Sequence, residues 1–397
     1  MVDSETAKTT TTLLSHLWNR RMIDQQEKFN TIVLSRIGFY NLAGMLEMYR
    51  RVGSATSVLE HRNDIREIVP EASPKLVDAF KDISELQRRA EEEMKWDDLN
   101  KVKILCLNDE EYPRRLAECD DAPLVLFYRG NASLNNQKII NIVGTRRCTV
   151  YGQDMIRRFI MDLKQYCPDA LIVSGLAYGV DIHAHRNALQ NGFETVGVLA
   201  HGLDYLYPQA HKEDAAKMIN QGGLLSEFMT CTNADKMNFV RRNRIVAGMS
   251  DACILVESAA HGGGLITARL SRDYNRDVFA FPGAVGAMYS EGCNNLIRDN
   301  GANLITCAYD MVKAMGWENG KQLSEARSKG IERQLFPQLT DEEQQVVKAL
   351  QKENDQQINM LCVTSCMAIG HLTALLFSME MKGIVKTLPG GVYHLLG

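Results

Sequence analysis

The sequence has no apolar run that approaches the roughly 20 residues needed to span a membrane. Its first residues lack the basic segment followed by an apolar segment that marks a secretory signal. The ten cysteines form no Cys-x-x-Cys pair, and most stand inside apolar runs, as Cys253 does. We therefore expect a cytoplasmic protein without a membrane contact or a zinc site, whose cysteines are buried, reduced thiols.

An excess of positive charge is also missing. The 397 residues include 45 Lys and Arg against 49 Asp and Glu, which gives a formal net charge of −4 at pH 7. A chain with this charge does not coat a nucleic acid with its whole surface. If its partner is anionic, the positive charge that binds this partner must be concentrated locally.

Common catalytic motifs are absent as well. The sequence contains no Gly-x-x-x-x-Gly-Lys-Ser/Thr loop for ATP hydrolysis and no Gly-x-Ser-x-Gly nucleophile elbow. Asp181, His183 and His185 suggest metal ligands, but helical residues that lie two apart point to different faces. We therefore interpret His185 as a residue that packs or caps a loop, and we expect no metal and no cofactor. The aromatic stretch 205–208, Tyr-Leu-Tyr-Pro, is interpreted as structural.

What the sequence does contain indicates three domains. Residues 1–100 are typical of a small helical domain of the helix-hairpin kind. From residue 101 to about 316, short strand-like runs alternate with helical stretches. These runs cover 103–107, 124–128, 139–143, 171–174, 195–199, 224–227, 253–257, 278–281 and 303–306. Near-continuous apolar strands separated by helices indicate a parallel sheet covered on both faces, which is the α/β, Rossmann-like, doubly wound fold.

The C-terminal part is predicted to be a winged-helix domain. Residues 317–335 are polar and contain glycine, which is typical of a linker. Thr340 begins a capping-box pattern, and two helical stretches follow it. A strand, a tight turn and a second strand then occupy 384–395. Helices followed by a short hairpin indicate a winged helix over residues 336–397.

Unusual sequence follows the predicted strands at their carboxyl ends, where an open parallel sheet binds its ligands. The strand at 139–143 is followed by Gly144, Thr145, Arg146 and Arg147. The strand at 253–257 is followed by Gly262, Gly263 and Gly264. Glycine lets backbone N–H groups approach an anion, and the start of a helix adds the positive end of its dipole. Several such loops at one edge of a sheet favour an anion site.

A second basic feature lies at 234–249, where four basic residues stand against one acidic residue. Three of the four, Arg241, Arg242 and Arg244, stand between Phe239 and an apolar run. Arginine grips phosphate through two hydrogen bonds and stacks on bases. Phe239 is either a platform on which a base stacks or a core residue.

The ordered motifs resemble those of the DprA/Smf family, the DNA-processing proteins of natural transformation. They are Ile142-Val143-Gly144-Thr145-Arg146, Ser174-Gly175-Leu176-Ala177-Tyr178-Gly179-Val180-Asp181, Gly202-Leu203-Asp204 with Tyr207-Pro208, Leu225-Ser226-Glu227, Asn238-Phe239, Arg241-Arg242-Asn243-Arg244-Ile245-Val246-Ala247, Leu265-Ile266-Thr267-Ala268, Phe281-Pro282-Gly283 and Gly292-Cys293-Asn294-Asn295-Leu296-Ile297. Their order and spacing agree with the family over about residues 101–316. The flanking domains agree more loosely.

The resemblance implies a binding protein rather than an enzyme. Members of the family bind single-stranded DNA in a basic pocket of the Rossmann-like domain, protect the incoming strand and help load the recombinase RecA onto it. They form homodimers through the same domain. The resemblance assigns DNA contacts to Gly144, Thr145, Arg146, Thr149, Asn238, Phe239, Arg242 and Asn243. We also predict DNA contacts for Arg147, Arg241 and Arg244, because of their charge. We predict them for Gly262, Gly263 and Gly264 because of their free N–H groups.

This chain departs from the family pattern in two loops. Thr145 stands where the family usually has serine, which keeps the hydroxyl group. Gly262-Gly263-Gly264 stands where the family usually has Ser-Gly-Ser, so the role of that loop depends on backbone N–H groups alone. If the arginines hold a strand, Arg146→Ala and Arg242→Ala should each weaken binding with little loss of folding.

Two enzyme classes compete with this interpretation. Nucleotide-cleaving phosphoribohydrolases use a similar glycine-rich scaffold, and Glu257 or Glu227 would then be the acid–base group. Their usual Pro-Gly-Gly-x-Gly-Thr loop has a proline and a threonine that residues 262–264 lack. Release of free base from nucleoside monophosphates would support that enzyme. A dinucleotide-dependent oxidoreductase is a weaker alternative, because the turn at Gly144 lacks the second and third glycines of its fingerprint.

Overall fold

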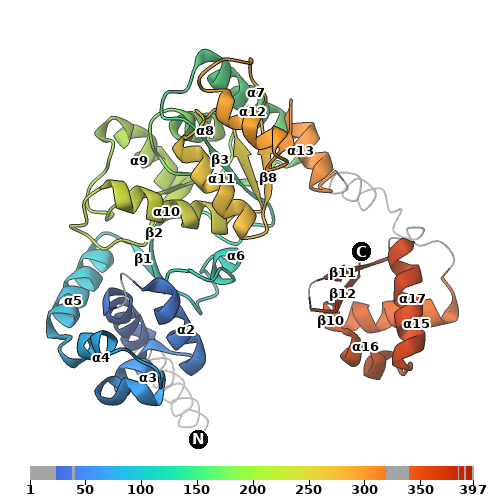
Figure 1. The fold of residues 1–397 in the computed structure, drawn as a ribbon, viewed down its shortest axis with the longest axis horizontal. Helices are drawn as coiled ribbons and strands as arrows, with labels where there is room; N and C mark the ends of the chain where they lie inside the picture. The colour runs from blue at the N-terminus through green and yellow to red at the C-terminus, as the bar shows by residue number, and fades with distance from the viewer. Residues whose placement is uncertain (1–23, 38–40, 319–338, 383, 389, 396–397) are drawn as a thin grey trace, which may run out of the picture. The chain divides into compact units, whose positions relative to one another are not determined.

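The computed structural model describes residues 24–37, 41–318, 339–382, 384–388 and 390–395 (Figure 1). The chain forms two compact units, Met1–Gly320 and Lys321–Gly397. Of the linker predicted over 317–335, residues 319–335 lie outside the described part. The N-terminal helices and the sheet share the first of these units.

A nine-stranded sheet forms the centre of the first unit, in the order β1-β2-β6-β5-β4-β3-β7-β8-β9. The strands are β1 (Lys103–Cys106), β2 (Val125–Gly130), β3 (Ile139–Val143), β4 (Leu171–Ser174), β5 (Thr195–Val198), β6 (Gly222–Ser226), β7 (Ala252–Leu255), β8 (Asp277–Ala280) and β9 (Asn303–Leu304). Neighbours from β6 through to β9 pair in parallel. Each predicted run forms one of these strands, so the α/β fold class is confirmed.

Strands β1 and β2 depart from the predicted parallel arrangement. They pair antiparallel with each other, and β2 pairs antiparallel with β6. Parallel neighbours need a crossover connection, usually a helix that covers the sheet. The helix between β1 and β2, α6 (Arg114–Ala117), has four residues and is too short for that purpose.

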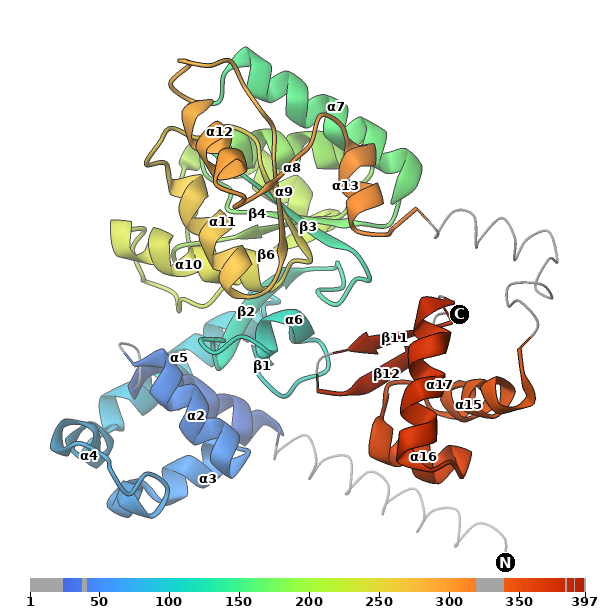
Figure 2. The same ribbon diagram turned by 45° about the vertical axis from the view of Figure 1, so that its right-hand side comes forward.

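Helices cover both faces of the parallel part of the sheet (Figures 1 and 2). In β3, Ile140 and Ile142 belong to a core that includes residues of α7, α8 and α13. Ile139 and Val143 belong to the opposite core, with residues of α10 and α11. The helices after β3 are α7 (Val150–Tyr166), α8 (Val180–Gln190), η2 (Gln209–His211), α9 (Lys212–Asn220), α10 (Lys236–Gly248), α11 (Gly263–Asp273), α12 (Glu291–Arg298) and α13 (Ala308–Ala314). Burial on both faces explains why the strands have no polar side.

The N-terminal helices pack on the antiparallel edge of the sheet. They comprise residues 24–37, α2 (Leu42–Val52), α3 (Ala55–Glu60), η1 (Arg62–Glu67), α4 (Pro74–Lys81) and α5 (Ser84–Leu99). Phe80 of α4 belongs to the same core as Phe127 of β2. Glu93 of α5 accepts hydrogen bonds from the backbone nitrogen of Thr230 at 2.8 Å and from its hydroxyl at 2.5 Å. The helices thereby hold the loop that leads into α10.

The second unit has its own core and the order of elements expected of a winged helix. It contains α15 (Asp341–Lys352), β10 (Gln356–Gln357), α16 (Ile358–Ser365), α17 (Ile369–Met381), β11 (Val385–Leu388) and β12 (Val392–Leu395). Thr340 and Glu343 form the predicted capping box. The prediction missed α16, whose apolar sequence shows no polar face, and the two-residue β10. No single helix in the described part is long and apolar enough to cross a membrane; only the pair α16 and α17, bent by 103°, has the combined length and composition.

Candidate nucleic-acid interface

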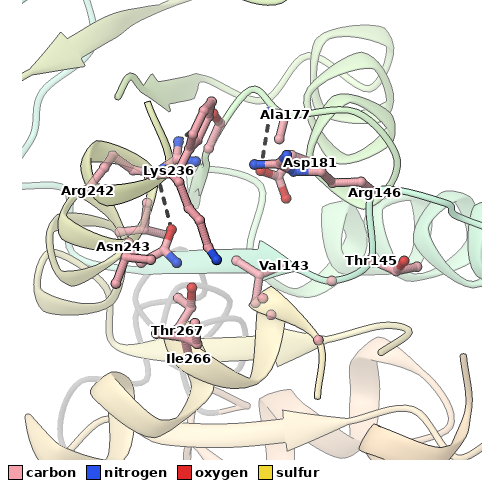
Figure 3. A pocket seen from close by; sticks show the side chains of 18 of the residues that line it. Val143, Thr145, Arg146, Ala177, Asp181, Lys236, Arg242, Asn243, Ile266 and Thr267 are labelled. Atoms are coloured by element: carbon pink, nitrogen blue, oxygen red, sulfur yellow. Dashed lines mark hydrogen bonds between the residues drawn. The ribbon is translucent and has the colours of Figure 1, made fainter. Parts of the chain in front are cut away.

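A cavity of about 600 Å³ opens at the carboxyl ends of β3 and β7 (Figure 3). The chain leaves β3 toward β4 on one side and returns to β7 on the other, and open α/β sheets bind ligands at this reversal of strand order. Four segments line the cavity. The lining residues are Val143, Gly144, Thr145, Arg146, Gly175, Ala177, Asp181, Lys236, Phe239, Val240, Arg242, Asn243, Val246, Ala259, Gly262, Gly263, Gly264, Ile266 and Thr267.

The cavity brings together most of the predicted DNA-binding residues from three loops and helix ends. The predicted residues that line it are Gly144, Thr145, Arg146, Phe239, Arg242, Asn243, Gly262, Gly263 and Gly264. Those that do not line it are Arg147, Thr149, Asn238, Arg241 and Arg244. Arg146 and Arg242 therefore lie at the same rim of the sheet.

Close backbone contact requires glycine at one point of the cavity wall and at one point beside it. A Cβ on Gly264 would meet the Cα of Gly144 at 2.9 Å. Gly179 has φ +76°, and a Cβ there would meet the carbonyl oxygen of Thr145 at 2.2 Å. The loop after β3 is also tied to the loop after β7, because Thr145 donates its N–H to the carbonyl of Glu257 at 2.8 Å. These contacts fix the distance between the two loops.

The start of α11 offers backbone N–H groups to the cavity. Gly262 is the N-cap residue, and no side chain caps the helix. The first N–H groups of a helix have no partner within it and carry its positive dipole end. Because a Cβ on Gly263 would have no neighbouring atom within 4 Å, this turn is open on the cavity side. An anion can therefore approach the backbone here without meeting a side chain.

Phe239 lies close to two arginines at the cavity wall. The guanidinium carbon of Arg146 lies 4.7 Å from the centre of the Phe239 ring, and that of Arg242 lies 5.9 Å from it. Arg146 is exposed, Phe239 is half-buried and Arg242 is buried. An arginine over an aromatic face is attracted by the ring quadrupole. The ring therefore orients an exposed cation at the mouth of the cavity.

Arg242 is held inside the wall. Its Nη1 donates to the carbonyl oxygens of Gly175 and Val198, and its Nε donates to Oδ1 of Asn243 at 3.3 Å. Burial lowers its pKa to about 10, against the opposing attraction of Asp181. Burial likewise raises the pKa of Asp181, whose carboxylate accepts the N–H of Ala177 at 3.3 Å. Removing this guanidinium would leave buried carbonyl oxygens without a donor. The prediction that Arg242→Ala causes little loss of folding was therefore wrong.

Arg241 and Arg244 point to another side of α10. Glu227 pairs with both, with its Oε1 3.2 Å from Nε of Arg241, and Arg244 also donates to the carbonyl of Asp121. Successive helical residues turn by about 100°, so residues 241 and 244 cannot share the face of Phe239. The structure therefore gives these two predicted contacts an internal carboxylate partner instead of a place at the cavity.

Three other predicted contacts lie outside the cavity lining. Thr149 caps α7 and donates its hydroxyl to Oε1 of Glu257 at 2.6 Å. Asn238 is buried and donates its side-chain amide to the carbonyl of Asn233 at 2.9 Å. Arg147 is exposed, but its side chain lies outside the cavity lining. None of the three reaches the cavity.

The carboxylates and histidines singled out in the sequence also have packing roles. Glu227 and Glu257 are buried, engaged as above, and absent from the cavity lining. His185 is buried and donates from Nδ1 to the hydroxyl of Thr195 at 2.7 Å, because that hydroxyl itself donates to a carbonyl. No group of three or more metal-ligating side chains occurs among the described residues.

Lys236 and Asp181 are the charged cavity residues that the site prediction missed. Figure 3 shows Lys236 on α10, extending beside Asn243 into the same space. Residues 236, 239, 240 and 243 follow the i, i+3, i+4, i+7 spacing of one helical face. That spacing, applied to the basic stretch, would have selected Lys236 and left out Arg241 and Arg244.

Comparison with known proteins gives the class. The family described as DNA recombination-mediator protein A matches residues 103–316, and the DprA winged helix domain matches residues 332–391. DNA processing protein DprA of Streptococcus pneumoniae is 38% identical over 215 residues, which are 54% of this chain and 75% of that protein. Protein Smf of Synechocystis sp. is 31% identical over 320 residues, 74% of this chain and 80% of that protein.

A solved structure agrees with these matches. The X-ray structure of DNA processing protein A from Streptococcus pneumoniae superposes with a TM-score of 0.60 at 31% sequence identity, and the match covers 72% of this chain and 97% of that one. A mostly parallel sheet with a basic cavity, followed by a winged helix, therefore defines a DNA-processing protein of the recombination-mediator class. The chain belongs to the DprA/Smf family.

Proposed function

We propose that the cavity at β3 and β7 binds single-stranded DNA. The observation that carries the proposal is the placement of Arg146 and Arg242 around the Phe239 ring, beside the glycine turn at the start of α11. Single-strand binding sites combine cations that follow the backbone with an aromatic ring on which a base stacks. Both components meet here in a space of about 600 Å³.

The charged groups contribute to binding in different ways. Arg146 and Lys236 are exposed and reach phosphate, whereas the buried Arg242 orients Asn243 and adds positive charge from within the wall. The N–H groups of Gly263 and Gly264 donate hydrogen bonds to a further phosphate oxygen. Three cations line the cavity, and Asp181 is the one carboxylate among the described lining residues. The cavity is therefore positive, although the chain as a whole is acidic. This is the local concentration of charge that the net charge requires.

Membership of the family supports a proposal for the cellular role. We propose that the protein protects an incoming strand during natural transformation and helps load RecA onto it in the cytoplasm, and that it acts as a homodimer formed through the Rossmann-like domain. RecA loading is tested by the rate of RecA filament formation on single-stranded DNA coated with a single-strand-binding protein. A rate that this protein does not raise contradicts that part of the proposal. Light scattering of the full chain tests the dimer.

Binding itself is tested by fluorescence anisotropy with a labelled oligothymidylate. Arg146→Ala and Lys236→Ala should each weaken binding by about tenfold, the loss of one charge-assisted contact. Arg147→Ala is the matched control, because it removes the same charge from the same loop but outside the cavity lining. Wild-type affinity in both cavity variants, or an equal loss in the control, would contradict the assignment of binding to this cavity.

A further inference from the structure

The aromatic stretch Tyr205-Leu206-Tyr207-Pro208, interpreted from the sequence as structural, contains two tyrosines in different environments. Tyr205 stacks on His201 at 4.5 Å, and its hydroxyl accepts the N–H of Ala234 at 2.5 Å. That tyrosine holds the loop before α10. Tyr207 is 46% exposed, and its contacts among the described residues leave its hydroxyl without a hydrogen bond. Packing therefore accounts for the first ring and not for the second.

The Tyr207 ring lies directly beside the proposed binding cavity. Its centre is 5.9 Å from that of Phe239, with an angle of 61° between the rings. Phe239 lines the cavity, whereas Tyr207 stands outside the lining, at the carboxyl end of β5. Arg146 covers the Phe239 ring at 4.7 Å, but no cation stacks on Tyr207 among the described residues. An aromatic face therefore remains open next to the first one.

The backbone of Tyr207 is fixed, although its ring is exposed. Its N–H donates to Nε2 of His201 at 3.1 Å, and Nδ1 of that histidine contacts the carbonyl of Gly202 at 2.7 Å. An acceptor at Nε2 and a donor at Nδ1 define one neutral tautomer. His201 is 1% exposed, and burial lowers its pKa, which favours the neutral ring. Pro208, which follows Tyr207, is buried.

We infer that Tyr207 is a second base-stacking platform, which receives the base next to the nucleotides held in the cavity. The inference rests on the proposed single-strand binding and extends the site from β3 and β7 across the carboxyl end of β5. An exposed ring on a fixed backbone loses little conformational freedom when a base stacks on it. Because every base has an aromatic face, this platform selects single-stranded nucleic acid without selecting sequence.

The experiment compares two ligands and three variants by fluorescence anisotropy of the full chain. A short oligothymidylate of about two nucleotides fits the cavity of about 600 Å³ alone, and a longer one of about sixteen also reaches Tyr207. The variants are Tyr207→Ala, Tyr207→Trp and Tyr309→Ala. Tyr309 is the matched control, because it is 42% exposed and packs against Tyr166, away from the cavity.

Loss of one stacked base should weaken binding of the long strand to Tyr207→Ala by about tenfold and leave the short strand unchanged. The tryptophan variant should bind the long strand at least as tightly as wild type, and the control variant should match wild type on both strands. Unchanged binding of the long strand to Tyr207→Ala would overturn the inference. An equal loss on both strands would also overturn it, because Tyr207 would then only support Phe239. Failure of the wild type to bind either strand would overturn the proposed function itself.

Discussion

The three arginines of α10 are alike in sequence and different in chemistry. Arg242 is buried against carbonyl oxygens, while Arg241 and Arg244 pair with Glu227. A guanidinium that is removed from water must have its donors satisfied, so each of these partners is needed for folding. Of the cations that line the cavity, the exposed Arg146 and Lys236 remain available to a ligand.

Arg242→Ala should lower the free energy of unfolding by about 3 kcal/mol, because it leaves two buried carbonyls without their donor and removes the positive charge that acts on the Asp181 carboxylate. Urea denaturation followed by circular dichroism measures this change. Lys236→Ala, on the exposed face of the same helix, should change the free energy of unfolding by less than about 0.5 kcal/mol. Equal stability of the two variants would contradict the buried role of Arg242.

His185 should make the protein less stable in mild acid. Burial lowers the pKa of His185 from 6.5 to about 3, so below pH 6.5 the unfolded chain binds a proton that the folded protein does not. The contribution of the neutral His185 to the free energy of unfolding is therefore complete above pH 6.5. This contribution is lost as the pH falls toward about 3, by up to about 1.4 kcal/mol per pH unit.

The test for His185 compares urea denaturation of wild type and His185→Gln at several pH values. The difference in unfolding free energy between the two proteins should narrow by roughly 2 kcal/mol as the pH falls from 6.5 to about 5. Other titrating groups are common to both proteins and cancel. A difference that stays constant with pH would show that His185 titrates normally in the folded state.

At the scale of elements, the loop after β3 contacts the start of α11. An added side chain should disturb this contact at Gly264 but not at Gly263. A Cβ on Gly264 would meet Leu255 at 2.8 Å and the Cα of Gly144 at 2.9 Å, whereas a Cβ on Gly263 has open space. Alanine is favoured over glycine within a helix by roughly 0.5–1 kcal/mol.

Gly263→Ala should therefore keep or slightly raise the melting temperature, because its Cβ enters open space. Gly264→Ala should lower the melting temperature and weaken binding, because the two loops that form the cavity must separate. Calorimetry and anisotropy on the same preparations measure both effects. If the two variants behave alike, the close approach of the loops does not matter for the site.

Elements with a simple pattern could be predicted from the sequence. The strands of the parallel sheet are apolar on both faces, and their carboxyl ends indicated where the cavity would lie. The orientation of β1 and β2 could not be predicted, because it depends on how β2 pairs with β6, far along the chain. The helix α16 lacks an amphipathic pattern, and its apolar residues contribute to a core that forms only in three dimensions.

The candidate site was predictable in its loops and less so in its side chains. The motif around Arg242 was found, but its partners Gly175 and Val198 belong to other strands and their loops, so its burial could not be seen. Lys236 was within the basic stretch and was passed over, although its spacing from Phe239 places both on one helical face. Tertiary contacts decided which cations are free.

At the scale of the whole molecule, the second unit should contribute little to single-strand binding. Residues 358–379, which include α16 and most of α17, contain no Lys, Arg, Asp or Glu. A surface without cations gains nothing from counterion release on binding phosphates. A chain that ends at residue 320, which keeps the entire core of the first unit, should bind oligothymidylate within about twofold of the full chain. A larger loss of affinity, measured by fluorescence anisotropy, would place part of the site in the winged helix.

Binding of a strand by this acidic chain depends on positive charge concentrated at one cavity, and salt dependence tests that claim most directly. Affinity for a single strand falls with salt by a log–log slope of roughly −0.7 per phosphate neutralised. The measurement is an anisotropy titration with oligothymidylate over a series of salt concentrations, for wild type, Arg147→Ala and the double variant Arg146→Ala/Lys236→Ala. The double variant should have a slope shallower than that of wild type by about 1.4, with Arg147→Ala close to wild type. Identical slopes for wild type and the double variant would contradict the claim that these two cations hold the phosphates of the strand.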